Sequence, residues 1–116
     1  MNAIKNFQTI IWHLKYRRGM YVAEGYLPLV SFLEGYGLAL RDVCQVDMFS
    51  DFQNWIYTRQ KRRFAVSWSS YILIDIAKKD EQKATDILFE WLSEFLAFDL
   101  DDPANSPLNQ PSETKE

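Results

Sequence analysis

Apolar side chains recur every three or four residues along most of this chain, which is the spacing of one face of an α-helix. The clearest case is residues 80–98, where one face carries Ala84, Ile87, Leu88, Trp91, Leu92, Phe95 and Leu96. Asp80 precedes this face as an N-cap, because its carboxylate can accept from the free amide groups of a first turn. The pattern therefore predicts a helix from Asp80 to Phe98.

The same spacing predicts three earlier helices, over residues 2–16, 27–46 and 50–60. Ser50 and Gln53 form a capping box for the third of these. The buried side of the second is expected to consist of Leu29, Val30, Leu33, Tyr36, Leu40 and Val43. Gly35 and Gly37 also lie in this helix, where each costs about 1 kcal/mol relative to alanine. We therefore expect another element to cross the helix closely at both glycines.

The segment 64–79 carries two conflicting patterns. Its β-branched and aromatic residues favour a strand, whereas Trp68, Ile72 and Ile76 are four residues apart, as on a helix. Nothing else in the chain has the pattern of a strand that could pair with it. We therefore predict a short buried helix from Ser69 to Lys79, with a strand as the alternative. The fold class predicted for residues 1–98 is all-α, a compact bundle of about five helices.

Composition changes after Phe98. Residues 99–116 contain three prolines, few large apolar residues, and five acidic residues against one lysine. Such a segment buries too little apolar surface to offset the entropy lost on ordering. The sequence predicts an acidic, proline-containing, disordered C-terminal tail over 99–116. This tail has a charge of −4, so the body is left at +1 within a net charge of −3.

Few residues are suited to chemistry. The single cysteine, Cys44, excludes an internal disulfide and a multi-cysteine metal site. The only histidine, His13, has no identifiable catalytic partner. No apolar run approaches the roughly 20 residues of a membrane helix, and the N-terminus lacks the layout of a secretory signal. We predict a cytoplasmic protein that is not an enzyme and has no catalytic residue, cofactor or metal.

One surface of the last predicted helix suggests a partner. Asp86, Glu90 and Glu94 are four residues apart on a face turned away from the apolar one, and Asp99 follows them. Acidic surfaces steer association with cationic proteins and can occupy their phosphate-binding clefts. These four residues are the predicted partner-binding site. The alternative is an ordinary solvated surface.

The most basic stretch offers a second reading. Arg59, Lys61, Arg62 and Arg63 lie within five residues at the end of the third predicted helix, interrupted only by Gln60. Such cations could contact phosphates while neighbouring aromatic rings stack on bases. A helix C-terminus also favours cations by itself. A nucleic-acid-associated regulatory protein is therefore the alternative function.

Four fragments carry a family-level resemblance. They are Arg-Gly-Met-Tyr-Val at 18–22, Leu-x-x-Phe-Leu-x-Gly-Tyr at 29–36, Ser-Trp at 67–68, and Asp-Glu-x-x-Ala…Phe…Leu-x-x-Phe at 80–95. In this combination the chain resembles small helical immunity proteins of bacterial polymorphic-toxin and contact-dependent inhibition systems, although Arg18 stands where that pattern has a proline. The resemblance implies a cytoplasmic, non-catalytic inhibitor of one cognate toxin domain. It transfers no binding position.

Overall fold

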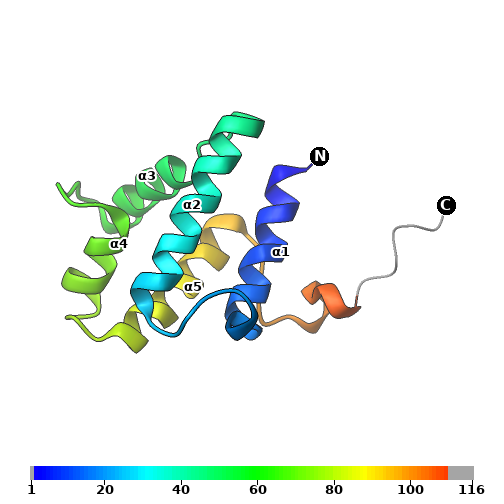
Figure 1. Cartoon of the computed structure of the whole chain (residues 1–116). Coiled ribbons are helices and arrows are strands. Elements are labelled where there is room, and N and C mark those ends of the chain that lie inside the picture. The colour runs from blue at the N-terminus through cyan, green and yellow to red at the C-terminus, as the bar shows by residue number, and fades with distance from the viewer. Residues whose placement is uncertain (1, 110–116) are drawn as a thin grey trace.

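Five α-helices make up most of the structure, a computed structural model that describes residues 2–109. They are α1 (Ala3–Tyr16), α2 (Tyr26–Cys44), α3 (Met48–Gln60), α4 (Trp68–Ser70) and α5 (Glu81–Leu96) (Figure 1). Shorter helical segments are η1 (Arg18–Met20), η2 (Tyr71–Ile76), η3 (Pro103–Asn105) and η4 (Pro107–Asn109). No strand occurs within residues 2–109. The predicted all-α bundle is confirmed.

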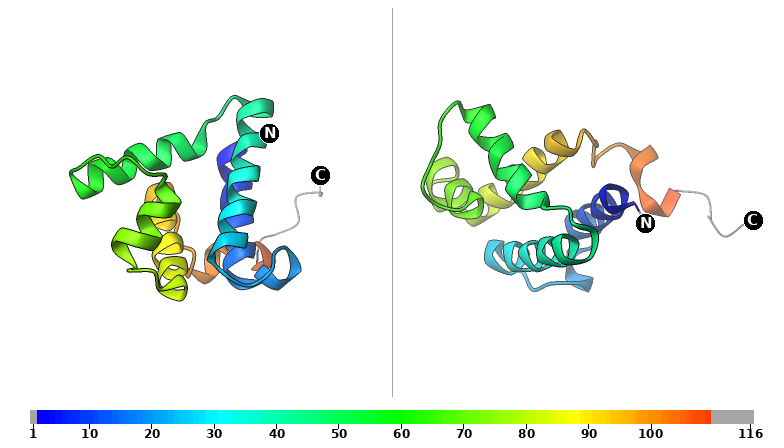
Figure 2. Two further views of the ribbon diagram at one scale, coloured as in Figure 1. Left: turned by 60° about the vertical axis from the view of Figure 1, so that its left-hand side comes forward. Right: turned by 90° about the horizontal axis from the view of Figure 1, so that it is seen from above.

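Helix α5 is the central element, because it contacts α1, α2, α3 and η2. Helices α1 and α2 lie side by side, and α3 leaves the end of α2 at a steep angle (Figure 2). The core residues with no exposed surface are Phe7, Ile11, Leu29, Leu33, Phe52, Ile56, Ile72, Ala84, Leu88 and Leu92. Their positions on four α-helices and η2 place the core around the apolar face of α5.

The N-cap predicted for α5 is confirmed, whereas the one predicted for α3 is wrong. The Asp80 carboxylate accepts from the Lys83 amide at 3.1 Å. In α3, Asp47 is the cap and accepts from the Ser50 amide at 3.3 Å, so the helix begins at Met48. Gln53 does not complete a capping box, because its Oε1 accepts from the Trp68 amide at 3.0 Å. Asp47 therefore takes the capping role predicted for Ser50, and the contact with Trp68 engages the Gln53 side chain.

Within the ambiguous segment 64–79, residues 68–76 are helical, so the predicted helix is confirmed over most of its length. It begins at Trp68 and ends at Ile76, whereas Ser69 and Lys79 were predicted as its ends. Ser67 caps α4 by accepting from the Ser70 amide at 3.3 Å. The chain continues as the π-helix η2, and the Ala77 amide donates to the Ile72 carbonyl at 2.9 Å. Tyr71 and Ile72 are buried in the core. Packing against α5 therefore places this β-branched segment in a helix.

Helix α2 begins at a cap from a distant part of the chain. The Glu81 carboxylate accepts from the Tyr26 amide at 3.0 Å, across 55 residues of sequence. Negative charge is favoured at a helix N-terminus because the first amides are unpaired. Gly25 precedes this turn with φ +114, a conformation that favours glycine. The start of α2 is thereby tied to the start of α5.

The two glycines of α2 differ in their surroundings. A Cβ on Gly37 would lie 2.6 Å from Cδ2 of Phe49, so the close crossing expected there is confirmed. A Cβ on Gly35 would meet no atom of the described residues within 4 Å, so the same expectation is wrong for Gly35. Val43 was expected to be buried but is 71% exposed. The last turn of α2, which carries Val43, projects past α5 (Figure 1).

Alanine substitutions at these two glycines should have opposite effects. Gly37→Ala should lower the free energy of unfolding by about 1–3 kcal/mol, because the methyl group collides with a packed ring. Gly35→Ala should raise it by up to about 1 kcal/mol, because alanine is the better helix former and the site is open. Urea denaturation of both variants measures the difference. Equal effects of the same sign would contradict this packing.

The predicted boundary of the disordered tail is wrong for residues 99–109. Leu100 is buried, and so is Ser106. The Asp102 carboxylate accepts from the Ala104 amide at 2.9 Å and caps η3. One apolar anchor and local aspartate caps therefore hold this polar segment against the bundle. The part of the prediction that concerns 110–116 lies outside the described residues.

Candidate functional site

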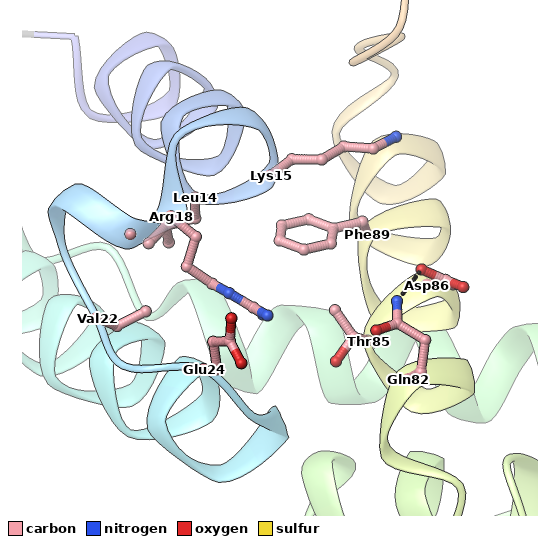
Figure 3. Close-up of a pocket in the computed structure, with 10 residues that line it drawn as sticks. Leu14, Lys15, Arg18, Val22, Glu24, Gln82, Thr85, Asp86 and Phe89 are labelled. Atoms are coloured by element: carbon pink, nitrogen blue, oxygen red, sulfur yellow. Dashed lines mark hydrogen bonds between the residues drawn. The ribbon is translucent and has the colours of Figure 1, made fainter.

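Two adjoining hollows run along α5. The larger, about 540 Å³, lies between α5, the end of α1 and the loop that follows α1, and is here named the α1–α5 cavity (Figure 3). The other, about 370 Å³, is here named the acidic groove. Its lining consists of Lys15, Asp86, Phe89, Glu90, Ser93, Glu94, Asp99, Leu100 and Asp101. All four predicted partner-binding residues are exposed and line this one groove.

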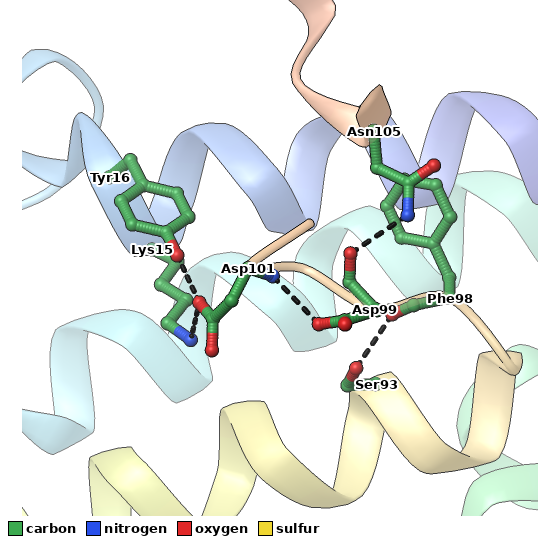
Figure 4. A network of polar contacts seen from close by, with 7 residues as sticks. All are labelled: Lys15, Tyr16, Ser93, Phe98, Asp99, Asp101 and Asn105. Carbon is green, nitrogen blue, oxygen red and sulfur yellow. Dashed lines mark hydrogen bonds and ion pairs between the residues drawn. The ribbon is translucent and has the colours of Figure 1, made fainter. Parts of the chain in front are cut away.

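Two features bring these carboxylates together. The helical spacing of α5 places Asp86, Glu90 and Glu94 in a row. Ala97 then ends the helix in the left-handed conformation, with φ 51, and turns the chain back toward α1. The Ser93 hydroxyl donates to the Phe98 carbonyl at 2.6 Å and holds this turn (Figure 4). Asp99 therefore joins the row from outside the helix.

The turn after α5 is itself held by hydrogen bonds. The Asp99 carboxylate accepts from the Asp101 amide at 2.9 Å, and the Asp99 carbonyl accepts from the Asn105 amide group at 2.8 Å. Figure 4 shows these contacts together with the Lys15 and Tyr16 side chains from α1. Asp99 is thus a structural residue of the turn as well as part of the groove.

The carboxylates of α5 differ in how they are already engaged. Glu94 forms an ion pair with Arg59 of α3. Asp86 accepts from the Gln82 amide group at 3.0 Å. Within residues 2–109, the Glu90 side chain has neither an ion pair nor a hydrogen bond. Glu90 is therefore the carboxylate of the row most available to a partner.

A polar cluster on α1 closes one end of the groove. Lys15 Nζ lies 2.7 Å from Asp101 Oδ1, and the Tyr16 hydroxyl donates to the same oxygen. The hydrogen bonds from Lys15 and Tyr16 lower the pKa of Asp101. The hydrogen bond with Asp101, together with burial and nearby negative charge, raises the pKa of Tyr16 to about 12. The sequence alone does not reveal this cluster, because Lys15 and Asp101 are 86 residues apart.

The Tyr16 shift predicts an alkaline dependence of stability. The folded pKa of about 12 exceeds the ordinary value of 10.0, so the Tyr16 contact stabilises the fold below pH 10. This contribution is lost as pH rises from 10 to 12. Asp101→Asn should bring the pKa of Tyr16 back toward 10, as measured by phenolate absorbance against a Tyr16→Phe reference. An unchanged titration in Asp101→Asn would contradict the assigned contact.

Arg59, the first residue of the predicted nucleic-acid site, contacts Glu94 of the acidic groove. Besides its ion pair with Glu94, its guanidinium carbon lies 5.3 Å from the ring centroid of Trp55 and 5.6 Å from that of Trp91. Cations over such rings are attracted by the negative ring face. Arg59 therefore links α3 to α5, and its charge is already balanced.

The other three basic residues lie on the turn after α3. Lys61 is exposed and ends the helix with φ 58. The Arg62 guanidinium lies 5.7 Å from the Tyr71 ring centroid, and that of Arg63 lies 4.7 Å from the Tyr57 ring centroid. Two of the three cations thus cover aromatic rings of their own chain. The predicted cluster is divided between the groove and this turn.

His13 lies apart from the acidic groove. Its Nδ1 is buried and finds no hydrogen-bond partner in the part of the chain that the structure describes, and its ring contacts those of Trp12 and Tyr21. Burial and the nearby charge of Arg17 lower the pKa of His13. Both effects favour the neutral ring, which packs among aromatic side chains.

Among residues 2–109, no group of three His, Cys, Asp or Glu side chains has the arrangement of metal ligands. No helix in the same range combines the length and apolar character needed to cross a membrane. Comparison with protein-family models, with curated proteins and with solved structures finds no match.

Proposed function

We propose that this protein is a non-catalytic inhibitor that neutralises a cognate bacterial toxin in the cytoplasm by binding and blocking it. The observation that carries the proposal is the meeting of Asp86, Glu90, Glu94 and Asp99 along one groove. The sequence resemblance to small helical immunity proteins also supports it. In this view the acidic groove is the surface that meets the toxin.

The proposed mechanism is electrostatic complementarity with a basic active site. Toxins that cleave nucleic acids bind phosphates, and cations in that cleft would attract the carboxylates of the groove. Glu90 supplies an unpaired charge, while the contact with Gln82 holds the carboxylate of Asp86 in place. Charged groups already held in position lose less entropy on binding. The α5 row would then compete with substrate phosphates for the same cations.

The area of a stable inhibitory interface requires that more of the surface than the carboxylate row contacts the toxin. Stable inhibitory complexes bury about 1,600 Å² in total, or about 800 Å² on each partner. One row of carboxylates is smaller than that. The turn 99–102 beside α5, in which Asp99, Asp101 and Asp102 are exposed, and the loop after α1 adjoin the groove and would extend the contact. The partner is therefore expected to cover the seam between α1 and α5.

A nucleic-acid-associated role through Arg59, Lys61, Arg62 and Arg63 is the alternative proposal. It receives less support, because Arg59 is paired with Glu94 and Arg62 and Arg63 cover aromatic rings. A salt titration with duplex DNA and RNA separates the two proposals. A steep fall in affinity with salt would favour the regulator, and absence of binding at low salt would reject it.

The decisive experiment uses the genomic neighbour. The product of a large toxin-like gene directly upstream should arrest bacterial growth when expressed alone and should be harmless when this protein is co-expressed. The two proteins should also elute together from a sizing column as a stoichiometric complex. Continued growth arrest with no complex would contradict the proposed inhibition. A neighbourhood of metabolic genes would also count against it.

A further inference from the structure

The α1–α5 cavity has the dimensions of a small-molecule site. Its volume of about 540 Å³ falls within the range of about 300–1,000 Å³ found for ligand pockets. Leu14, Val22 and Phe89 give it an apolar wall. Ligand pockets typically combine such a wall with a few convergent polar groups that set the orientation of the ligand. The charged groups at the rim therefore determine what the cavity could bind.

Arg18 brings an unbalanced positive charge to this cavity. Its guanidinium borders the cavity, and its Nη1 is buried and has no hydrogen-bond partner among residues 2–109. A guanidinium stays protonated in proteins, so Arg18 cannot avoid the cost of an unsatisfied charged group by losing its proton. A buried donor without an acceptor destabilises the free protein. A ligand oxygen in the cavity would accept from the part of the guanidinium that borders it and would balance the charge of Arg18.

Glu24 brings the matching negative charge. Within residues 2–109, its carboxylate has neither an ion pair nor a hydrogen bond, even with Arg18. Figure 3 shows Arg18 and Glu24 on the loop side of the cavity, opposite Thr85 and Gln82 of α5. The other two charged residues of the lining are already engaged, Lys15 with Asp101 and Asp86 with Gln82. One cation and one anion are therefore left for a ligand.

We propose that this cavity binds a small zwitterion, a free α-amino acid with an apolar side chain. The ligand carboxylate accepts from Arg18, and a charge-assisted pair of this kind is among the stronger hydrogen bonds in proteins. The ligand ammonium donates to Glu24, and its side chain packs against Leu14, Val22 and Phe89. Each charge of the ligand meets an opposite charge, so neither is buried alone. This site does not depend on the proposed toxin.

The test is a calorimetric titration of the full chain with L-leucine. Isocaproate, which lacks the ammonium, and isoamylamine, which lacks the carboxylate, serve as comparison ligands. Leucine should bind, and each comparison ligand should bind at least about tenfold more weakly, because one charge pair is lost. Failure of leucine to bind at millimolar concentration would overturn the proposal. Equal binding of all three ligands would also overturn it.

Two variants assign the binding to the residues. Arg18→Gln and Glu24→Gln should each weaken leucine binding by about tenfold or more. Arg41→Gln is the matched control, because Arg41 is an exposed arginine of α2 whose ion pair is with Asp42. It should bind leucine like the original protein. Circular dichroism verifies the fold of each variant, and a folded Arg18→Gln protein with unchanged affinity would overturn the proposal.

Discussion

Replacing Phe52 by alanine should lower the free energy of unfolding by about 3–5 kcal/mol. The Phe52 side chain is fully buried. Its ring centroid lies 6.1 Å from that of Phe49, 5.6 Å from that of Trp68 and 5.3 Å from that of Phe95. Truncation removes this apolar burial and leaves a cavity. The surrounding rings cannot easily fill it, because Phe49 and Phe95 also pack against other rings.

Such a loss would be a large part of the total stability of a domain, which is typically about 5–15 kcal/mol. Urea denaturation with matched slopes measures it. Leu27→Ala is the control, because Leu27 is 61% exposed and its truncation should change stability by no more than about 0.5 kcal/mol. If Phe52→Ala cost less than about 1 kcal/mol, the aromatic cluster around it could not be the main core.

Reversing the charge of Glu90 should weaken binding of the proposed toxin by about tenfold to a thousandfold, or about 1.4–4 kcal/mol. Glu90 is exposed, lines the acidic groove and has no ion pair within residues 2–109. A lysine there would face the cations of the toxin and repel them. The first effect should be a slower association rate that depends on salt, because a charge of this kind steers the encounter. Surface plasmon resonance at two ionic strengths measures the association rate constant and the dissociation constant.

The choice of residue matters for this test. Glu94→Lys would also place a second cation beside Arg59 and disturb the contact between α3 and α5. Asp75→Lys is the matched control, because Asp75 is an exposed acidic residue outside the groove. It changes the net charge equally and should leave the affinity nearly unchanged. If both variants bound the toxin equally well, the groove would not be the interface, although inhibition through another surface would stand.

The two predicted surfaces are joined in the folded protein. Arg59 belongs to the predicted nucleic-acid site and Glu94 belongs to the predicted partner-binding site. The two side chains form one ion pair. Thirty-five residues separate them in the sequence. The pair removes one charge from each proposed interface. It leaves Glu90 as the clearest probe of the acidic side.

The sequence by itself determined the features that depend on neighbours a few residues apart. The apolar spacing and Asp80 together predicted α5, since a helical face and its N-cap involve positions three or four residues apart. The same spacing placed Asp86, Glu90 and Glu94 in one row. These features require no knowledge of the rest of the chain.

The tertiary structure decided which of several residues with similar local sequence makes a packing contact with a distant part of the chain. Gly35 and Gly37 have similar sequence surroundings, but only Gly37 lies against Phe49. The tail had too little apolar surface to predict order, yet Leu100 enters the core and Asp101 meets Lys15. The contacts that decide these cases join residues far apart in the chain. Local patterns cannot reveal them, because they arise only when the helices pack together.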